Sequence, residues 1–461
     1  MPHQNRKQKD MNTQLANAEI LPLLIKLAIP ATIAQLVNAL YSIVDRMYIG
    51  HMPSTGILAL SGIGLTFPIT MLISAFSCLP GMGGAPLASI AIGKGDLHKA
   101  ESYLTNALIM LVFISALMTF GTLSFLHPLL TLFGADEQTF PYASEYLQIY
   151  LMGTIFVELA LGLNPFINAQ GFTFIGTISV VIGAVLNILL DPLLIYTLNF
   201  GIRGAAIATV CSQLISCIWI IHFLSSKTSN IQIHLKNLKP DYKILFSTCA
   251  LGISPFTFRV NESIIVILLN RLLLKYGGAD GNLHLASMAI LSSVGQIFFM
   301  PLLGIVTGAQ PLLSYNYGSR NYARIRSTIH YARLLSMGCA TFMWIFLVFF
   351  PKLVCNLFTS TPNLINLTSK TMPIMFSSVF ILGFQMINQN AFVAMGNTRY
   401  SFLFGIMRKV LFLVPLSLIL PYFMGVWGIY AAEAVSNPIT TLITFFVFEN
   451  FMGKIQIESE I

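Results

Sequence analysis

The stretch "LPLLIKLAIPATIAQLVNALYSIVDRMYIG", residues 21–50, decides the fold. It is apolar over more than 20 residues, and its only charged residues are Lys26, Asp45 and Arg46. A helix of that length crosses a hydrocarbon core about 30 Å thick. An ionisable side chain inside such a helix is costly and marks a cavity or an ion path by default, although a carboxylate paired with a neighbouring arginine can also be structural.

The composition of the whole chain agrees with a membrane protein. The 461 residues are 56% hydrophobic and only 9% charged, whereas soluble domains carry about 25% charged residues. Apolar runs recur along the whole chain, and each must form a helix because a lipid-exposed backbone has to satisfy its own hydrogen bonds. We therefore predict an all-α polytopic membrane protein with twelve spans, at residues 20–48, 57–82, 103–126, 142–168, 173–198, 204–224, 244–274, 285–312, 328–350, 371–394, 400–422 and 428–449.

An internal repeat divides these spans into two sets of six. Similar motifs recur 223 to 225 residues apart, as the following pairs show: Pro30 and Pro255, Asp45 and Asn270, Pro86 and Pro311, Gly93 and Gly318, Gly171 and Gly396, Pro192 and Pro415, Gly201 and Gly425, Gly204 and Gly428. Six spans is an even number, so both copies enter the membrane from the same side. The repeat predicts two parallel six-helix lobes related by a pseudo-two-fold axis along the membrane normal, an arrangement typical of alternating-access transporters. A duplicated scaffold without transport activity is the alternative.

The distribution of basic residues predicts the orientation. With the N-terminus inside, fourteen Lys and Arg residues lie in the cytoplasmic loops and tails, against four in the opposite loops. The predicted segments are a cytoplasmic tail (1–19), the first lobe (20–224), a cytoplasmic linker (225–243), the second lobe (244–449) and a second cytoplasmic tail (450–461). The net charge of +8 then faces the anionic lipid of the cell membrane, and no nucleic-acid partner is expected.

Motifs for nucleotide hydrolysis or other enzymatic chemistry are missing from the sequence. It contains no GxxxxGK[ST], HExxH or GxSxG pattern. We therefore expect no enzyme and no cofactor, and an ion gradient has to supply the work. We expect a monomer.

Three helices of the first lobe carry polar positions four residues apart, and hence on one helix face. These pairs are Tyr41 and Asp45, Asn187 and Asp191, and Ala205 and Thr209. Pro192 removes a helix hydrogen bond and frees a backbone carbonyl beside them. Oxygen ligands suit a hard cation such as Na⁺. A proton suits the site equally well, because two nearby carboxylates in a low-dielectric pocket cannot both be charged cheaply without a cation.

The sequence resembles the multidrug and toxic compound extrusion (MATE) transporters of the multidrug/oligosaccharidyl-lipid/polysaccharide flippase superfamily. The resemblance covers nearly the whole chain and is carried by "LAIPATIAQLVNALYSIVDRMYIGH" (27–51), "GGAPLASIAIGKGD" (83–96), "NAQGFTFIGTISVVIGAVLNILLDPLLIY" (168–196) and "GIRGAAIAT" (201–209). It implies export of amphipathic, often cationic drugs in exchange for Na⁺ or H⁺. It also implies a cation site at Asp45, Asn187 and Asp191, surrounded by Tyr41, Asn164 and Thr209.

Further polar residues lie inside predicted spans without matching the family motifs. Glu158 is in the fourth span, where it can contact substrate or be a protonated, hydrogen-bonded carboxyl between helices. The second lobe carries a larger set: Arg259, Glu262, Gln385, Asn388, Arg408, Lys409 and Glu433. A glutamate in the seventh span resembles the cation site of another MATE branch, but the aspartate partner in the tenth span is missing. We interpret the charges of this set as an internal ion-pair network rather than a second cation site.

A flippase for a lipid-linked precursor, from the same superfamily, is the second functional hypothesis. Such a protein needs a basic cleft for a diphosphate group. Arg259 and Arg408 facing a cavity without partners would favour it, whereas their neutralisation by Glu262 and Glu433 would favour the exporter.

Overall fold

A computed structural model describes residues 11–52, 56–233, 239–359 and 361–460. All regular elements among these residues are helices. The first half of the chain forms α2 (Ile20–Gly50), α3 (Gly56–Phe76), α4 (Cys78–Gly93), α5 (Leu97–Ser124), α6 (Leu126–Leu132), α7 (Phe140–Met152), α8 (Thr154–Ala169), α9 (Thr173–Pro192), the π-helical turn η1 (Leu193–Thr197) and α10 (Ile202–Leu224).

The second half repeats this sequence of elements. It forms α11 (Tyr242–Gly277), η3 (Gly278–Asp280), α12 (Gly281–Gly318), α13 (Tyr322–Phe349), α14 (Pro351–Asn356), α15 (Pro362–Met375), η4 (Val379–Ile381), α16 (Leu382–Ala394), α17 (Thr398–Ile406), the π-helical segment η5 (Met407–Leu413), α18 (Val414–Met424) and α19 (Trp427–Glu460).

These helices account for the twelve predicted spans. Nine helical stretches of the described chain are long and apolar enough to cross a membrane, and two further spans are helix pairs, α7 with α8 and α15 with η4 and α16, bent by 58° and 45°. One of the nine stretches, 242–318, contains two long helices, α11 and α12, joined by η3. The prediction of twelve spans is thereby confirmed.

The second span extends further than the sequence predicted. The apolar run was expected to end at residue 82, but α4 continues to Gly93. A neighbouring backbone approaches its glycine-rich segment closely: a Cβ added at Gly83 would overlap the carbonyl oxygen of Thr248, and one added at Gly252 would overlap that of Leu79. Small residues permit such close packing of helices in a membrane.

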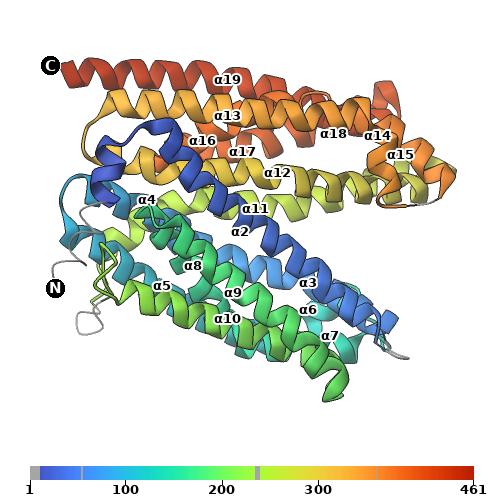
Figure 1. Cartoon of the computed structure of the whole chain (residues 1–461). Coiled ribbons are helices and arrows are strands. Elements are labelled where there is room, and N and C mark those ends of the chain that lie inside the picture. The colour runs from blue at the N-terminus through green and yellow to red at the C-terminus, as the bar shows by residue number, and fades with distance from the viewer. Residues whose placement is uncertain (1–10, 53–55, 234–238, 360, 461) are drawn as a thin grey trace. The chain divides into compact units, whose positions relative to one another are not determined.

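The chain divides into two compact units. The first consists of residues 29–256 with the described part of 1–18, and the second of 19–28 with 257–461. In the first unit, α4 packs against α5 and α8, and α9 lies alongside α10 (Figure 1). In the second unit, α12 lies alongside α13, and α18 packs against α19.

Matching backbone features mark the internal repeat in both units. Gly201 before α10 has φ 55° and ψ −132°, and Gly425 before α19 has φ 58° and ψ −145°. A Cβ at Gly204 would lie 2.7 Å from the carbonyl oxygen of Leu194, and one at Gly428 would lie 2.6 Å from that of Leu420. The spacing of 224 residues therefore holds in three dimensions for this turn. It aligns the helix that begins after Gly201 with the helix that begins after Gly425.

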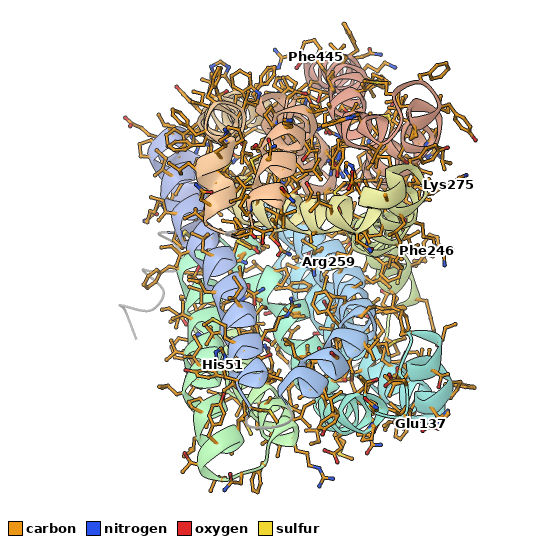
Figure 2. All side chains as sticks on the ribbon, turned by 90° about the vertical axis from the view of Figure 1, so that its right-hand side faces the viewer. His51, Glu137, Phe246, Arg259, Lys275 and Phe445 are labelled. Carbon is orange, nitrogen blue, oxygen red and sulfur yellow. The ribbon has the colours of Figure 1, made fainter. Side chains whose placement is uncertain are left out.

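Large apolar side chains cover the outside of the helices, as expected for a protein in lipid. Phe113 and Phe120 of α5 are 68% and 71% exposed, and Phe446 of α19 is 67% exposed. Carbon predominates among the outward-pointing side chains, and the labelled charged residues Glu137 and Lys275 lie near helix ends (Figure 2). This chain is a multi-span membrane protein.

Candidate functional site

Two carboxyl groups meet inside the first unit. Asp45, in the C-terminal part of α2, and Asp191, at the end of α9, are 8% and 0% exposed. Their side chains lie within hydrogen-bonding reach of one another. These two acids are 146 residues apart in the chain. Their positions in the fold agree with the expectation from the sequence that they lie at one site.

Asn187 and Thr209 complete the polar centre around Asp191. The Nδ2 group of Asn187 lies 3.4 Å from Asp191 Oδ1 and 3.4 Å from Thr209 Oγ1, toward both of which it donates. Among the described residues, no N–H or O–H group donates to Asp45 Oδ1, Asn187 Oδ1 or Asp191 Oδ2, although all three atoms are buried. Buried oxygens without donors are costly unless a proton or a cation satisfies them.

A helix irregularity places these residues. Pro192 interrupts the hydrogen bonds of α9, and the chain continues as the π-helical turn η1. From this turn the hydroxyl of Tyr196 donates to the carbonyl oxygen of Tyr48 at 2.5 Å, which ties the end of α9 to α2 beside Asp45. Single π-turns in helices often occur at functional sites.

The phenols of Tyr41 and Tyr146 lie near the carboxyl pair, and that of Tyr150 lies near Tyr41. Tyr41, one turn before Asp45, is close enough to both carboxyl groups for them to act on its hydroxyl electrostatically. On α7, Tyr146 reaches the hydroxyl of Thr209 and stacks on Tyr150 with ring centroids 6.3 Å apart. The sequence analysis did not identify Tyr146 and Tyr150, although their spacing of four residues places both phenols on one face of the helix.

Two other residues of the predicted site have different surroundings. Asn164 on α8 donates to the carbonyl oxygen of Gly176 at 2.9 Å and to Ser179 Oγ at 2.7 Å, so it joins α8 to α9. Among the described residues, Asn164 forms no hydrogen bond with Asp45 or Asp191. Ala205 is fully buried on α10, one turn before Thr209. A role for Asn164 and Ala205 in cation binding stays a prediction.

Arg46 supplies the positive charge next to the pair. It is exposed on α2, acts electrostatically on Asp45, and its guanidinium carbon lies 4.7 Å from the centroid of the Phe67 ring. With both aspartates ionised, the two carboxylates and this arginine sum to one negative charge. One monovalent cation would neutralise them.

Glu158 lies in the interior of α8, fully buried in the first unit. Neither of its carboxyl oxygens has a hydrogen-bond partner in the part of the chain that the structure describes. The expectation of a hydrogen-bonded carboxyl between helices was therefore wrong in its hydrogen bond. An ionised carboxylate in this position would be far more costly than a protonated one, so the burial favours the neutral form.

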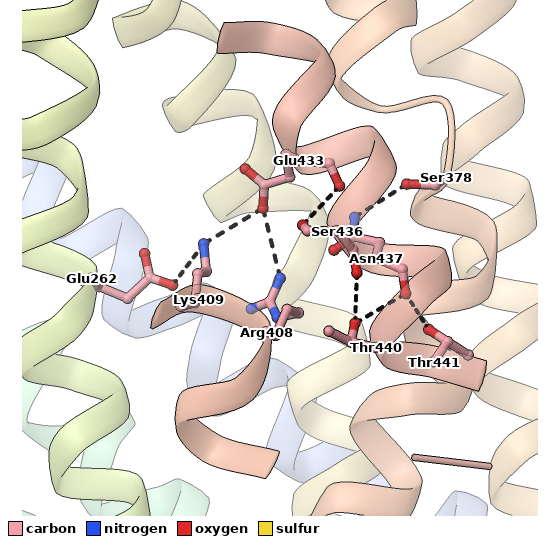
Figure 3. A network of polar contacts seen from close by, with 9 residues as sticks. All are labelled: Glu262, Ser378, Arg408, Lys409, Glu433, Ser436, Asn437, Thr440 and Thr441. Carbon is pink, nitrogen blue, oxygen red and sulfur yellow. Dashed lines mark hydrogen bonds and ion pairs between the residues drawn. The ribbon is translucent and has the colours of Figure 1, made fainter. Parts of the chain in front are cut away.

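Four of the five charged residues predicted to form an ion-pair network in the second unit do so, with Lys409 at the centre (Figure 3), and the prediction was wrong for Arg259. Lys409 Nζ lies 3.2 Å from Glu262 Oε1 and 3.5 Å from Glu433 Oε1. Arg408 Nη1 lies 3.6 Å from the same oxygen of Glu433. Glu262 therefore pairs with Lys409, whereas Arg259 is exposed on α11 (Figure 2) and has no ion-pair partner among the described residues.

Gln385 and Asn388 do not belong to this network. The Oδ1 atom of Asn388 accepts a 2.8 Å hydrogen bond from Arg333 Nε, and Arg333 also pairs with Glu449 at 2.8 Å. Gln385 is buried, and neither of its side-chain polar atoms has a partner among the described residues. Lys409 and Arg333 are thus the centres of two separate groups, and Gln385 belongs to neither. The sequence analysis missed Arg333 because its position in α13 matched no motif.

The contact between Asn187 and Thr209 leads to a testable prediction. Thr209→Val keeps the shape of the side chain but removes the hydroxyl next to Asn187. Loss of one hydrogen bond costs about 0.5–1.5 kcal/mol, so, if this centre binds a cation, we expect its dissociation constant to rise roughly twofold to tenfold in a binding measurement. Thr177→Val is the matched control, because the buried Thr177 hydroxyl donates only within α9, to the Thr173 carbonyl. If both variants bind the cation with equal affinity, Thr209 does not contribute to the site.

Several known proteins are similar to this chain in sequence over most of its length. Relatives include the multidrug export protein MepA of Staphylococcus haemolyticus strain JCSC1435, 24% identical over 442 residues and covering 96% of each chain. MepA of Staphylococcus aureus strain MRSA252 is 24% identical over 425 residues, covering 91% of this chain and 92% of that protein.

Solved structures agree in fold. A MATE protein crystallised in complex with MaD3S matches with a TM-score of 0.89 at 23% identity, over 96% of this chain and 99% of that one. The outward-facing conformation of a multidrug resistance MATE family transporter of the MOP superfamily matches with the same TM-score over 96% and 98% of the two chains. The MatE family model matches residues 30–193 and 260–419, which is most of the chain and both copies of the repeat. The chain therefore belongs to the MatE family, in agreement with the resemblance seen in its sequence.

Proposed function

We propose that this protein is a secondary active multidrug exporter that exchanges external Na⁺ or H⁺ for amphipathic, mainly cationic compounds by alternating access. The observation that carries the proposal is the buried pair Asp45 and Asp191, with three oxygen atoms at the centre that receive no hydrogen bond from the described part of the chain. The names of the MepA relatives support drugs as the cargo.

The proposed mechanism uses competition between ion and drug. A cation from outside neutralises the surplus negative charge of the aspartate pair and stabilises one arrangement of α2 and α9, which favours release of the drug. Loss of the cation to the cytoplasm restores the charge and the arrangement that binds drug. Coupling requires only that the cation bind one conformation more tightly than the other. The interrupted end of α9 at Pro192 is a place where such a rearrangement can occur.

The chemistry of the centre accommodates either ion. Carboxylate, amide and hydroxyl oxygens from Asp45, Asn187, Asp191 and Thr209 are the ligands that a hard cation prefers. A proton shared between the two carboxyl groups would also remove their repulsion. Sodium and protons are therefore expected to compete for one site.

Transport by the purified protein in proteoliposomes tests this proposal. Sodium and proton gradients are imposed separately, and efflux of a fluorescent cationic drug is recorded. We expect at least one of the two gradients to drive efflux, and the other ion, at equal concentration on both sides, to slow it. If neither gradient moves the drug while the protein is folded, the exporter proposal is wrong.

A flippase for a lipid-linked precursor is the second candidate, because Arg259 is exposed and lacks an ion-pair partner among the described residues. Arg408, by contrast, is paired with Glu433. The same vesicles distinguish the two functions: reorientation of a labelled lipid diphosphate, lost in Arg259→Gln, would favour the flippase. An unchanged lipid distribution together with gradient-driven drug efflux would favour the exporter.

A further inference from the structure

Each unit has a centre of charged or polar residues on three helices, and the three helices are equivalent in the two copies of the repeat. The total charge of the two centres differs. In the first unit the centre is formed by α2, α9 and α10, and in the second by α11, η5 and α19. The repeat spacing of 224 residues aligns Thr209 with Glu433. The backbone angles of Gly201 and Gly425 agree with this alignment.

The first centre needs a cation from outside the chain. When ionised, Asp45 and Asp191 carry two negative charges, and Arg46 supplies one positive charge. The unsatisfied oxygens of this centre show that no side chain of the described residues fills it.

The second centre is neutral by itself. Glu262 and Glu433 carry two negative charges, and Arg408 and Lys409 carry two positive charges at 3.2 to 3.6 Å from them. The Lys409 side chain is only 9% exposed, and its ammonium group lies between carboxylates of two different helices (Figure 3). A lysine ammonium is a compact point charge on a flexible stem, so it can take the position of a free monovalent cation.

Among the described residues, no other charged group forms an ion pair with these four. Arg259 lies one turn before Glu262 on α11 and makes no ion pair among the described residues. In the helices that flank η5, Arg399 and Tyr400 are at the far end of α17, and Tyr422 is near the far end of α18. Lys409 is therefore the group whose charge decides whether the second centre is neutral.

We propose that Lys409 is a tethered cation that fills the second centre, so that the protein binds its coupling ion in the first unit only. This inference rests on the proposed function, because only an exporter driven by an ion gradient has a coupling ion. The charge balance of the second centre does not depend on that function. Lys409→Met leaves one uncompensated negative charge among Glu262, Glu433 and Arg408. The variant is then expected to bind one additional Na⁺ or H⁺.

The test uses a background in which the first centre cannot interfere. In Asp45→Asn/Asp191→Asn protein, binding of radioactive sodium and proton uptake are measured on the purified full chain in detergent, with and without Lys409→Met. We expect about one cation more per protein with Lys409→Met than without it. Lys409→Arg, which keeps the charge, should add none, and Lys409→Met/Glu433→Gln, which restores neutrality, should lose the gain.

Stability provides a second measurement, because removing one partner of a buried ion pair is strongly destabilising. A ligand that binds only the folded protein raises its melting temperature. The melting temperature of the Lys409→Met protein should rise with sodium or with falling pH by more than that of the Lys409→Met/Glu433→Gln protein. If Lys409→Met can be purified only at high sodium or low pH, the proposal is supported in the same way.

Two results would overturn the proposal: no additional cation in the folded Lys409→Met protein, or recovery and melting that depend on neither sodium nor pH. Neither result would affect the proposed exporter function, which depends on Asp45 and Asp191. Conversely, if Asp45→Asn/Asp191→Asn leaves cation binding in the otherwise wild-type chain intact, the first centre is wrongly assigned. Even then, the role of Lys409 is decided by comparing the Asp45→Asn/Asp191→Asn protein with and without Lys409→Met.

Discussion

Asp45→Asn and Asp191→Asn should each abolish gradient-driven drug efflux. An amide has nearly the shape of the carboxyl group but cannot carry the charge that attracts the cation or accept the proton. With one carboxyl group replaced, the remaining carboxylate and Arg46 balance and the site no longer attracts a cation. A hydrogen bond or contact to a charged group contributes about 1.5–3 kcal/mol, so we expect efflux to fall at least about tenfold, since each 1.4 kcal/mol is a factor of ten. Initial rates of efflux from proteoliposomes with equal amounts of folded protein provide the measurement.

Asp96→Asn is the matched control for this pair. Asp96 lies in the same unit, and its side chain accepts a 3.0 Å hydrogen bond from the backbone N–H of Lys99 at the start of α5. Asparagine caps a helix about as well as aspartate, so this variant should transport at the wild-type rate. Wild-type rates in Asp45→Asn and Asp191→Asn as well would show that the two acids are not the coupling site.

Gly83→Ala should destabilise the first unit. A Cβ at this position would overlap the carbonyl oxygen of Thr248 and lie 2.7 Å from the backbone nitrogen of Gly252. Backbone atoms cannot move aside as a flexible side chain can, so α4 and the first part of α11 would have to separate. Overpacking typically costs about 1–3 kcal/mol, and we expect a clearly lower melting temperature in detergent.

Gly121→Ala tests whether any added methyl group on a membrane helix has this effect. Gly121 lies near the end of α5, and a Cβ there would meet no atom within 4 Å. Alanine has the higher helix propensity, so this variant should melt at or above the wild-type temperature. If the Gly83→Ala and Gly121→Ala proteins have the same melting temperature, the close contact between α4 and α11 contributes no stability.

The number and type of spans could be predicted because each depends on a long local run of apolar residues. The carboxyl pair could also be predicted, since Asp45 and Asp191 stand out as acids inside apolar segments and each has a polar neighbour four residues away. The end of the second span could not, because the glycines at residues 81, 83 and 84 lower the hydrophobic signal while allowing close helix contact.

Pairing between distant helices was harder to predict. The sequence places Arg259 one helical turn from Glu262, but in the fold Glu262 forms its ion pair with Lys409 instead. Which base meets which acid depends on helix rotation, which apolar surroundings specify only loosely. The phenols of Tyr146 and Tyr150 were missed for a related reason: tyrosine is common in packed helices, and only its approach to Thr209 and Tyr41 distinguishes these two.

Direct measurement of cation binding tests the central claim most closely. Purified wild-type protein is equilibrated with radioactive sodium, or in lightly buffered solution with a pH electrode, and a cationic drug is then added. The aspartate pair should hold about one monovalent cation per protein, drug should release it, and Asp191→Asn should bind none. Undiminished binding in Asp191→Asn, or drug binding that leaves the cation in place, would contradict the account.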